Sequence, residues 1–513
     1  MKSVKIILAA ALLLAYPVLA LSEEEPVIAH GDPAAPAING PRVIGTTPGK
    51  PFLFLIPATG EAPLTYAAEN LPLGLTLDPK TGIISGSLLY GGEYDVKITV
   101  SNPKGSATRK LKILGGVHKL AQTPPLGWNS WNVWGLSVSA DKVKAAADAM
   151  VKSGLTAHGF SYVNIDDGWE KGHDTAKRAL SDINALFNAG WDHGRDQDGN
   201  ILTNDKFPDM KELADYLHSK GLKLGIYSSP GVQTCGRYEG SYGHELEDAK
   251  TYAQWGIDYL KYDWCTYTVD AHGIRLNDFQ EPYVHMRKHL DEIDRDIVYS
   301  LCQYGMKKVW TWGAEVGGNL WRTTGDITDT WKSLSTIGFK QPEIAQYSGP
   351  GHWNDPDMLV VGKVGWGPTL HESKLNKAEQ LTHITIWAME AAPLLIGCDM
   401  TNMDQFTLDL LTNDDVLAID QDPLGKAAIV KARNGLTEVW ARPLFDGAMA
   451  VALFNKSDEK VEVIANWQDL GLQGTQPVRD LWQRKDLGSF DGSFKAAVLP
   501  HCAVMVKVGS PAE

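Results

Sequence analysis

The stretch Ile257-Asp-Tyr-Leu-Lys-Tyr-Asp-Trp-Cys265 contains the pattern that decides the fold. A buried parallel strand is expected to be almost wholly apolar, yet this one carries Lys261 and ends in Asp263. Polar side chains at the carboxyl end of a strand are typical of a (β/α)8 barrel, whose active-site loops all open on that face. A surface ion pair at a strand end produces the same local pattern, so the choice depends on the rest of the chain.

Helical and strand patterns alternate on both sides of this stretch. The predicted helices are 140–153, 211–220, 245–256 and 281–293, and the predicted strands are 127–130, 162–166, 222–227, 259–263, 297–301, 320–323, 357–361 and 393–398. About eight such units make one barrel. A doubly wound sheet is the alternative, but the chain has no Gly-rich phosphate turn to support it. We therefore predict a (β/α)8 TIM barrel over residues 120–423.

Two β domains are predicted to flank the barrel. Residues 37–115 contain short β-prone runs separated by Pro, Gly and Asn turns, which indicate a small β-sandwich. Within it, residues 71–86 resemble the immunoglobulin-like modules of secreted bacterial proteins, and we expect a spacer because no exposed aromatic row is visible. Residues 424–513 are expected to form an antiparallel β domain. The acidic, then Pro/Ala-rich residues 21–36 are interpreted as a flexible linker.

The amino terminus and the charge balance limit where the protein works. Residues 1–20 have a basic start, a short apolar run and a small-residue exit, which predict a signal peptide and an exported protein, periplasmic or extracellular. No later stretch is long and apolar enough to insert into a membrane. The net charge of −14 argues against nucleic acid or an anionic membrane as a partner. The sequence leaves the oligomeric state open, with a homo-oligomer allowed.

Polar and aromatic side chains follow the strands of the predicted barrel and should gather on one rim. Carboxylates accept hydrogen bonds from sugar hydroxyls, Lys and Arg donate to sugar oxygens, and Trp or Tyr faces suit the C–H surface of a sugar ring. This mixture predicts a carbohydrate substrate. In chain order the side chains are Trp131, Asp166, Asp167, Tyr227, Lys261, Asp263, Gln303, Arg322 and Asp326.

The carboxylates could alternatively hold a metal ion. We consider this the weaker interpretation because Lys261 and Arg322 already supply positive charge. The five cysteines show no CxxC or Cys/His metal spacing, and residues 196–200 are only a fragment of a calcium loop. We therefore expect no metal and no cofactor.

Two of these residues fit glycoside hydrolysis, which needs two carboxyl groups beside the scissile bond. Asp263 ends the fourth strand and Asp326 lies just beyond the sixth, so both can face the barrel mouth. Lys261 lies two residues before Asp263 on the same side of the strand, and its charge should keep Asp263 ionised, as a nucleophile requires. Asp326 would then be the acid, although the sequence alone does not show how its proton is held.

Six motifs in series extend the match along the barrel. They are Gly127-Trp-Asn-Ser-Trp131, Ile165-Asp-Asp-Gly-Trp169, Gly221-Leu-Lys-Leu-Gly-Ile-Tyr227, Trp255-Gly-Ile-Asp-Tyr-Leu-Lys-Tyr-Asp263, Trp321-Arg322 with Asp326, and Trp353-Asn-Asp-Pro-Asp-Met358. With these motifs, residues 124–425 resemble glycoside hydrolase family 27. That family contains α-galactosidases, α-N-acetylgalactosaminidases and some β-L-arabinopyranosidases.

The resemblance implies a role for each matched residue. Asp263 matches the nucleophile and Asp326 the acid/base, and Cys235 and Cys265 match a disulfide beside the site. The positions matched to sugar binding are Asp166 and Asp167 for the 4- and 6-hydroxyls, Lys261 for the 3- and 4-hydroxyls, Arg322 for the 2-position, and Trp131 and Tyr227 for the pocket wall.

Two departures from the family pattern concern specificity. Many α-galactosidases carry Cys-Glu-Trp at the fifth strand, where this chain has Cys302-Gln303-Tyr304. Gln303 can still bind a hydroxyl, but the change bears on which sugar is accepted. Residues 170–200 are longer than in typical members and are expected to form a loop over the substrate path, with binding of substrate or an ion left open.

The sequence therefore predicts a retaining exo-glycoside hydrolase that releases terminal α-D-galactose from oligo- or polysaccharides. A β-L-arabinopyranosidase is the first alternative and an α-N-acetylgalactosaminidase the second. A carbohydrate-binding protein without catalysis is the alternative from a different class, and the presence of both Asp263 and Asp326 argues against it.

Overall fold

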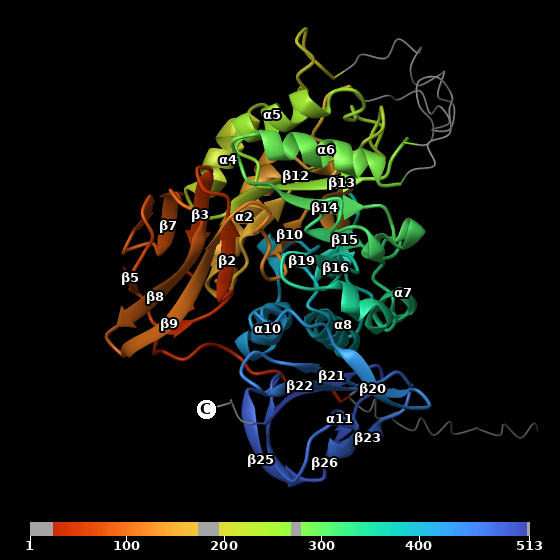
Figure 1. Ribbon diagram of the computed structural model, residues 1–513. Helices are drawn as coiled ribbons and strands as arrows, with labels where there is room; N and C mark the ends of the chain where they lie inside the picture. The colour runs from red at the N-terminus through yellow and green to blue at the C-terminus, as the bar shows by residue number, and fades with distance from the viewer. Residues whose placement is uncertain (1–23, 173–193, 268–278, 510–513) are drawn as a thin grey trace, which may run out of the picture.

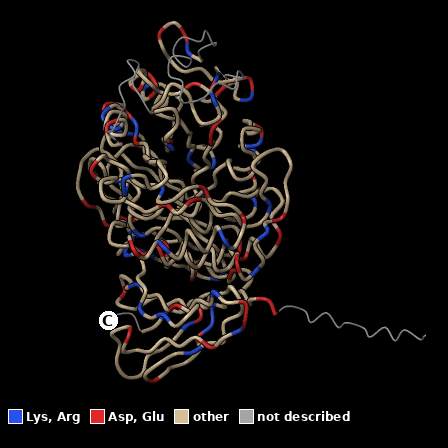
Figure 2. The backbone as a smooth tube through the Cα atoms, turned by 90° about the vertical axis from the view of Figure 1, so that its right-hand side faces the viewer, with Lys and Arg blue, Asp and Glu red and all other residues tan. Residues whose placement is uncertain are grey.

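The computed structural model describes residues 24–172, 194–267 and 279–509 as a central barrel flanked by two β domains (Figure 1). The predicted signal peptide lies outside the described residues, as does most of the predicted loop 170–200. No helix in the described parts is long and apolar enough to cross a membrane. Acidic and basic positions are interspersed along the chain, as Figure 2 shows.

Eight parallel strands form the barrel, which confirms the predicted fold class. Their order in the sheet is β16-β15-β14-β13-β12-β11-β10-β19. The sheet closes on itself because Leu359, beyond β16, pairs in parallel with Ile396 of β19. The strands are β10 (Leu126–Asn129), β11 (Tyr162–Asn164), β12 (Lys223–Ser228), β13 (Tyr259–Asp263), β14 (Val298–Cys302), β15 (Leu320–Arg322), β16 (Trp353–Asp355) and β19 (Leu394–Ile396).

One predicted strand is wrong. The seventh strand was expected at 357–361 from its apolar run, but β16 lies earlier, at Trp353–Asp355. Residues 358–361 are buried, yet only Leu359 makes a ladder contact. Periodicity alone does not separate a buried strand from a buried loop. The shift places Asp355 at the strand end and Asp357 in the loop above it.

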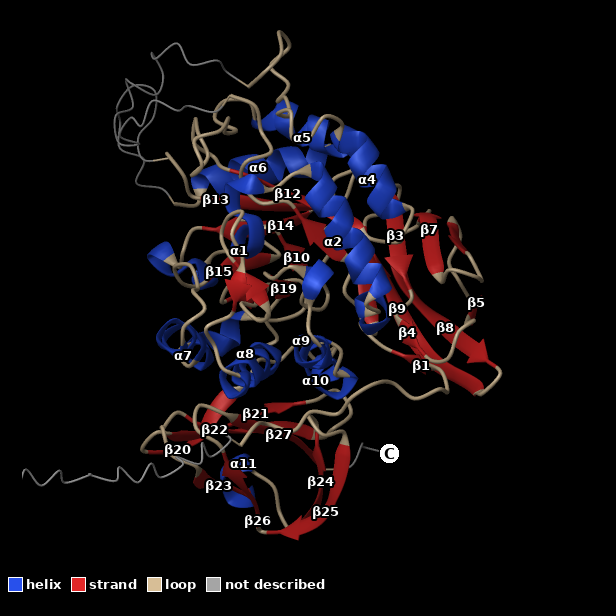
Figure 3. Ribbon diagram, turned by 180° about the vertical axis from the view of Figure 1, so that it is seen from behind, coloured by secondary structure: helices blue, strands red, loops and turns tan. Residues whose placement is uncertain are grey.

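Helices cover the outside of the barrel (Figure 3). Several of them begin at a residue whose side chain caps the helix. Asp209 accepts the N–H of Glu212 at 2.8 Å, and Asn376 and Glu379 form a capping box. The helices are α1 (Trp131–Trp134), α2 (Ala140–Lys152), α4 (Met210–His218), α5 (Glu245–Trp255), α6 (Glu281–Glu292), α7 (Trp331–Gly338), α8 (Lys377–Glu390), α9 (Gln405–Leu411) and α10 (Asp414–Asp420).

The amino-terminal β-sandwich packs against the face of the barrel where the strands begin. Thr47 N–H donates to Asp296 at 2.7 Å, and a cavity of about 230 Å³ between the two domains is lined by Tyr162, Lys223 and Val298, the first residues of their strands. This domain therefore lies opposite the catalytic face. Its strands are β2 (Val43–Thr46), β9 (Gly105–Gly115), β8 (Gly92–Asn102) and β5 (Thr65–Glu69) in one sheet, β3 (Pro51–Leu55), β7 (Ile83–Ser87) and β6 (Leu75–Leu77) in the other, with β1 (Ala37–Ile38) paired to β4 (Ala58–Thr59).

The carboxyl-terminal antiparallel domain rests on helix α8. Arg442 donates to the carbonyl of Ala388 at 2.7 Å, and the Trp482 indole donates to Thr385 at 2.9 Å. A turn at His501, where φ is +52°, separates the last two strands of this domain. The strands are β20 (Ile429–Asn434), β21 (Thr437–Pro443), β22 (Met449–Asn455), β27 (Ala503–Val508), β24 (Thr475–Asp480) and β25 (Lys485–Asp491), with β23 (Val461–Asn466) paired to β26 (Ser493–Val498).

Residues 24–36, which we call the strap, are not the loose linker that their composition predicted. Glu25 pairs with Lys377 of the barrel at 2.6 Å, and Glu24 pairs with Lys460 of the carboxyl-terminal domain at 2.6 Å. Further along, the carbonyl of Gly31 accepts from Arg484 at 2.8 Å. The acidic residues that suggested disorder find basic partners on two domains, and the strap therefore connects all three.

The strap makes stability depend on the protonation of His158. This buried side chain bonds Asp414 through Nδ1 at 2.8 Å and Asp32 of the strap through Nε2 at 3.4 Å. Burial alone would lower the pKa of His158, but the hydrogen bonds to the two aspartates outweigh it and raise the pKa to about 9. Because the folded pKa exceeds the unfolded value of about 6.5, this stabilisation is complete below pH 6.5 and is lost as the pH rises through 9.

We therefore expect the urea midpoint to fall between pH 6.5 and 9.5, and His158→Gln to remove most of that fall. The Gln variant should be less stable than the natural protein at pH 6 and closer to it at pH 9.5. Parallel stability curves for the two proteins would show that His158 does not hold the strap through its charge.

Candidate active site

Asp263 ends strand β13 and accepts two hydrogen bonds. The Tyr227 hydroxyl donates to Oδ2 at 2.9 Å and the Trp264 N–H donates to Oδ1 at 2.7 Å. Tyr304 lies close enough to help lower the pKa of the carboxyl group. Burial raises the pKa of Asp263, while Lys261 and the two tyrosines lower it. Lys261 therefore lowers the pKa of Asp263, as predicted, but burial raises this pKa more strongly.

Lys261 makes its direct ion pair with Asp166. Its Nζ lies 2.8 Å from Asp166 Oδ2 and 5.3 Å from the centre of the Tyr227 ring. Burial disfavours the charge of Lys261, but Asp166 outweighs it and raises the pKa of the lysine well above its usual range. The two side chains are thus an ion pair inside the barrel mouth, and together they offer a donor and an acceptor to hydroxyl groups.

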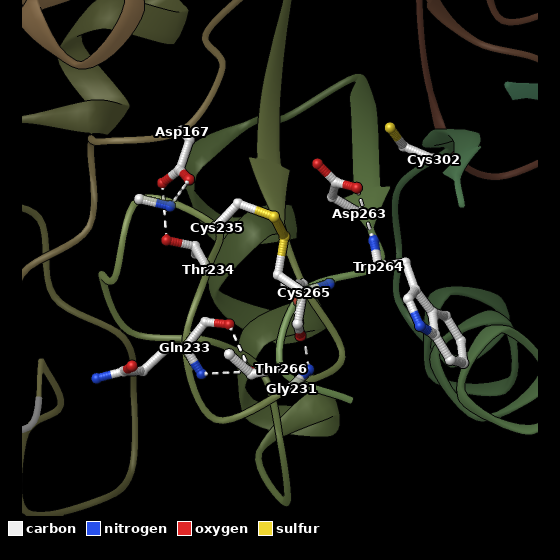
Figure 4. The surroundings of a disulfide bond; sticks show 12 residues. Asp167, Gly231, Gln233, Thr234, Cys235, Asp263, Trp264, Cys265, Thr266 and Cys302 are labelled. Atoms are coloured by element: carbon white, nitrogen blue, oxygen red, sulfur yellow. Dashed lines mark hydrogen bonds between the residues drawn. A yellow bond between two sulfur atoms is a disulfide. The ribbon is translucent and has the colours of Figure 1, made fainter. Parts of the chain in front are cut away.

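Asp167 is held by the loop that carries one half of the disulfide (Figure 4). Its Oδ1 accepts from the Thr234 hydroxyl at 2.8 Å, and its Oδ2 accepts from the Gly236 N–H. A side chain at Gly236 would bring Cβ within 2.8 Å of that carboxylate. Burial, together with the nearby Asp166 and Asp263 charges, outweighs these bonds and raises the pKa of Asp167 to about 7.

The disulfide joins this loop to the end of strand β13. Cys235 lies between Thr234 and Gly236, and Cys265 lies two residues after Asp263, with the two Cα atoms 5.1 Å apart. The Tyr227 hydroxyl is 3.3 Å from the Cys265 sulfur. The pairing that the resemblance implied is therefore present, and it links the support of Asp167 to that of Asp263. The other cysteines are buried thiols, namely Cys302, Cys398 and Cys502.

Arg322 and Asp326 lie on the neighbouring part of the rim. In the strand registers, Asp263 pairs with Cys302, and the Arg322 guanidinium lies 3.9 Å from the Cys302 sulfur. Arg322 Nη2 contacts Asp326 Oδ1 at 3.1 Å and Asp357 Oδ2 at 2.9 Å. Asp326 is 58% exposed whereas Asp357 is 2% exposed, so the two acids on one guanidinium differ sharply in environment.

The remaining predicted residues differ in how the structure places them. Gln303 follows β14, is wholly buried, and has no hydrogen-bond partner for either side-chain amide atom in the described residues. Trp131 opens helix α1 and is partly exposed, as a pocket wall requires. Trp128 and Trp169, by contrast, are fully buried core residues.

Sequence reasoning missed two residues of this site. Asp357 was not among the expected site residues, although its motif, Trp353–Met358, was recognised. Tyr304 was noted only as a departure at the fifth strand, and it proves to lie close enough to Asp263 for each to affect the pKa of the other. The position of a polar residue just after a barrel strand was the available signal for both.

Two groups of side chains in the described residues are close enough to hold a metal. One combines Asp263 with Cys235 and Cys265, whose sulfurs are already joined to each other. The other is Asp32, His158 and Asp414 at the strap, where both ring nitrogens of the histidine bond carboxylates. Neither is a typical ligand set. The expected absence of a metal or cofactor stays a prediction.

Family models match all three domains. Residues 123–422 match the family described as alpha galactosidase A, and residues 434–508 match the alpha galactosidase C-terminal beta sandwich domain. Residues 35–114 match an Ig domain family.

Relatives and solved structures agree with this assignment. The chain is 43% identical to an α-galactosidase of Cyamopsis tetragonoloba over 392 residues, which are 75% of this chain and 86% of that protein. A candidate α-galactosidase/melibiase of Bacteroides fragilis has a solved structure with 37% identity and a TM-score of 0.83, covering 94% of this chain and 98% of that one. A β-L-arabinopyranosidase of Geobacillus stearothermophilus is more distant, at 28% identity and a TM-score of 0.66 over 76% of this chain and 97% of that one. The chain belongs to glycoside hydrolase family 27, the alpha galactosidase A family.

Proposed function

We propose that the protein is a retaining exo-glycosidase that releases terminal α-D-galactose. One observation carries the proposal: a buried carboxylate, Asp263, held by Tyr227 at the barrel mouth, lies on the same part of the rim as a second, exposed carboxylate, Asp326, held by Arg322. Relatives at 40–43% identity over most of the chain are named α-galactosidases. The more distant arabinopyranosidase makes that activity the second candidate.

The two carboxyl groups divide the reaction between them. Asp263 attacks the anomeric carbon while Asp326 donates a proton to the departing oxygen, and the sugar becomes bound to Asp263 as an ester. The Tyr227 and Trp264 donors orient the attacking carboxylate. Asp326, now ionised, then takes a proton from water, which attacks the same carbon and frees Asp263. The two inversions leave the released sugar with its original anomeric configuration.

Sugar recognition falls to the groups around Asp263. The Lys261–Asp166 pair offers a donor and an acceptor to adjacent hydroxyls, and Asp167, which is partly protonated near pH 7, can do either. Among the residues that the structure describes, none uses the donor or acceptor of the Gln303 amide, which is therefore available for a hydroxyl. An N-acetyl group at the 2-position is bulkier than a hydroxyl and is less well suited to the buried surroundings of Gln303 and Arg322.

We also propose that the protein is exported and works in the periplasm or outside the cell. The basic and apolar residues 1–20 support export. The Cys235–Cys265 disulfide beside the site suits an oxidising compartment.

Three p-nitrophenyl glycosides compared side by side test the function: the α-D-galactopyranoside, the β-L-arabinopyranoside and the α-N-acetylgalactosaminide. We expect the highest kcat/KM on the galactoside, because it alone adds a C6 hydroxyl for Asp166 or Asp167 while keeping a small 2-substituent. The arabinoside shares the ring stereochemistry without C6, so preference for it would overturn the galactose assignment. No release from any of the three would overturn the assignment as a glycosidase of this type.

A further inference from the structure

We propose that Asp357 is a positioning residue for the acid/base Asp326, acting through Arg322 and through the backbone that follows Asp326. The inference rests on the proposed function, because Asp326 has an acid/base role only in a glycosidase. It gives a functional role to a buried aspartate in the loop that follows strand β16, a residue that is not one of the two reacting carboxylates.

Asp357 contacts both sides of the segment that carries Asp326. Its Oδ2 lies 2.9 Å from Arg322 Nη2, and that same nitrogen lies 3.1 Å from Asp326 Oδ1. The same Oδ2 accepts the N–H of Ile327, the residue after Asp326, at 2.8 Å. One carboxylate oxygen therefore fixes the guanidinium that holds the Asp326 side chain and also the peptide that carries it.

Asp326 needs this support because the rest of its surroundings are open. Its side chain is 58% exposed, and its hydrogen bond to Arg322 is the one that the described residues show. An exposed carboxylate adopts several rotamers, and fixing it for proton transfer costs free energy unless a neighbour orients it. Arg322 is 2% exposed and can orient Asp326 only if its own position is fixed.

Asp357 is itself rigidly placed. It is 2% exposed, its Oδ1 accepts the Met358 N–H at 2.9 Å, and its N–H donates to Asp355 at 2.8 Å. Its carbonyl accepts from the Trp387 indole of helix α8 at 2.7 Å. Its φ of +97° is rare for a residue with a side chain, and such strain persists only where the surroundings hold it.

The charge of Asp357 also matters to Asp326. Burial raises the pKa of Asp357 to about 6, even though Arg322 lowers it, and the nearby Asp326 and Asp355 charges add to the rise. With Asp357 ionised, Arg322 is shared between two carboxylates. With Asp357 neutral, Arg322 pairs more fully with Asp326 alone.

Asp357→Asn tests this role because it removes the charge of Asp357, while Asn has the same shape as Asp and tolerates a positive φ. We expect kcat/KM on a galactoside with a poor leaving group, such as the methyl α-galactoside, to fall about 10- to 100-fold. On the 2,4-dinitrophenyl α-galactoside, which needs little protonation, it should fall less than about threefold.

Asp329→Asn is the control. Asp329 is an equally buried aspartate three residues after Asp326, but it pairs with Lys374 at 3.2 Å. We expect this variant to lose activity equally, if at all, on both substrates. Asp357→Gly, which suits the positive φ and removes the carboxylate, should regain activity on the poor leaving group when formate is added. Formate should not help the natural protein.

The outcomes test the proposed function and the positioning role of Asp357 separately. If the natural protein cleaves neither galactoside, the proposed function fails. If it cleaves both, but both Asp357 variants lose activity equally on the two substrates or lose none, the positioning role is overturned. Because the ratio of the two substrates is measured within each sample, partial unfolding of a variant does not imitate the expected result.

Discussion

Asp263→Asn should lower kcat/KM on aryl α-galactosides by about 10⁴-fold or more, because the variant keeps the shape of the site but lacks the attacking carboxylate. Burial works against the ionised form of Asp263, and its tyrosine and backbone donors recover only part of that cost. A neutral amide of the same size should therefore leave the protein at least as stable as before. Thermal unfolding measured beside the kinetics would show that chemistry, not folding, is lost.

Azide can replace the missing nucleophile of the Asp263→Asn variant, so that the prediction is tested by a product that forms as well as by an activity that is lost. A small anion can enter the space in front of Asn at position 263 and attack the anomeric carbon from the side that Asp263 normally uses. The expected product from an α-galactoside with a good leaving group is β-galactosyl azide, identified by NMR. Wild-type activity in the variant, or an azide product of α configuration, would show that Asp263 is not the nucleophile.

The same residue sets the acid side of the pH profile. Burial raises the pKa of Asp263, so the group protonates at higher pH than an exposed aspartate does. A nucleophile must be ionised, and kcat/KM is therefore expected to fall as the pH drops through this raised value. Tyr227→Phe removes one donor to the carboxylate and should move that limb further up in pH.

The alternation of helix and strand patterns was enough to predict the barrel, because period and length are properties of the local sequence. Strand β13 was predicted with its observed bounds, Tyr259–Asp263. The seventh strand was misplaced because a buried apolar loop and a buried strand have the same composition. The strap was interpreted as loose because its partners, such as Lys377 and Arg484, lie hundreds of residues away and are invisible to a local reading.

For the site, too, some features were predictable from the sequence and others were not. Residues that follow a strand in a recognisable motif, such as Asp263 and Arg322, were identified from the sequence. The pairing between the side chains was not predicted: the charge of Lys261 was expected to keep Asp263 ionised, but the direct ion pair of Lys261 is with Asp166. The positioning role of Asp357 depends on one carboxylate oxygen that contacts both Arg322 and the N–H of Ile327. Only the three-dimensional structure shows these two contacts.

Asp326→Asn is expected to separate substrates by their leaving groups. On methyl α-galactoside, kcat/KM should fall about 10²- to 10⁴-fold because the departing alkoxide needs a proton. On the dinitrophenyl α-galactoside the first step should be little affected, but water now lacks its base. The galactosyl ester on Asp263 should then accumulate, seen as a burst of dinitrophenolate followed by a slow steady rate with a low KM.

Azide again decides the role, because it attacks the accumulated ester without needing a base. It should speed the steady rate and yield α-galactosyl azide, the anomer opposite to the one expected from Asp263→Asn. Arg322 contacts Asp326 through one oxygen that Asn retains, so the change removes the proton-transfer group while leaving its position largely intact. If the two variants gave the reverse pair of anomers, the roles of Asp263 and Asp326 would have to be exchanged. If both gave the β product, Asp326 would not act in the second step.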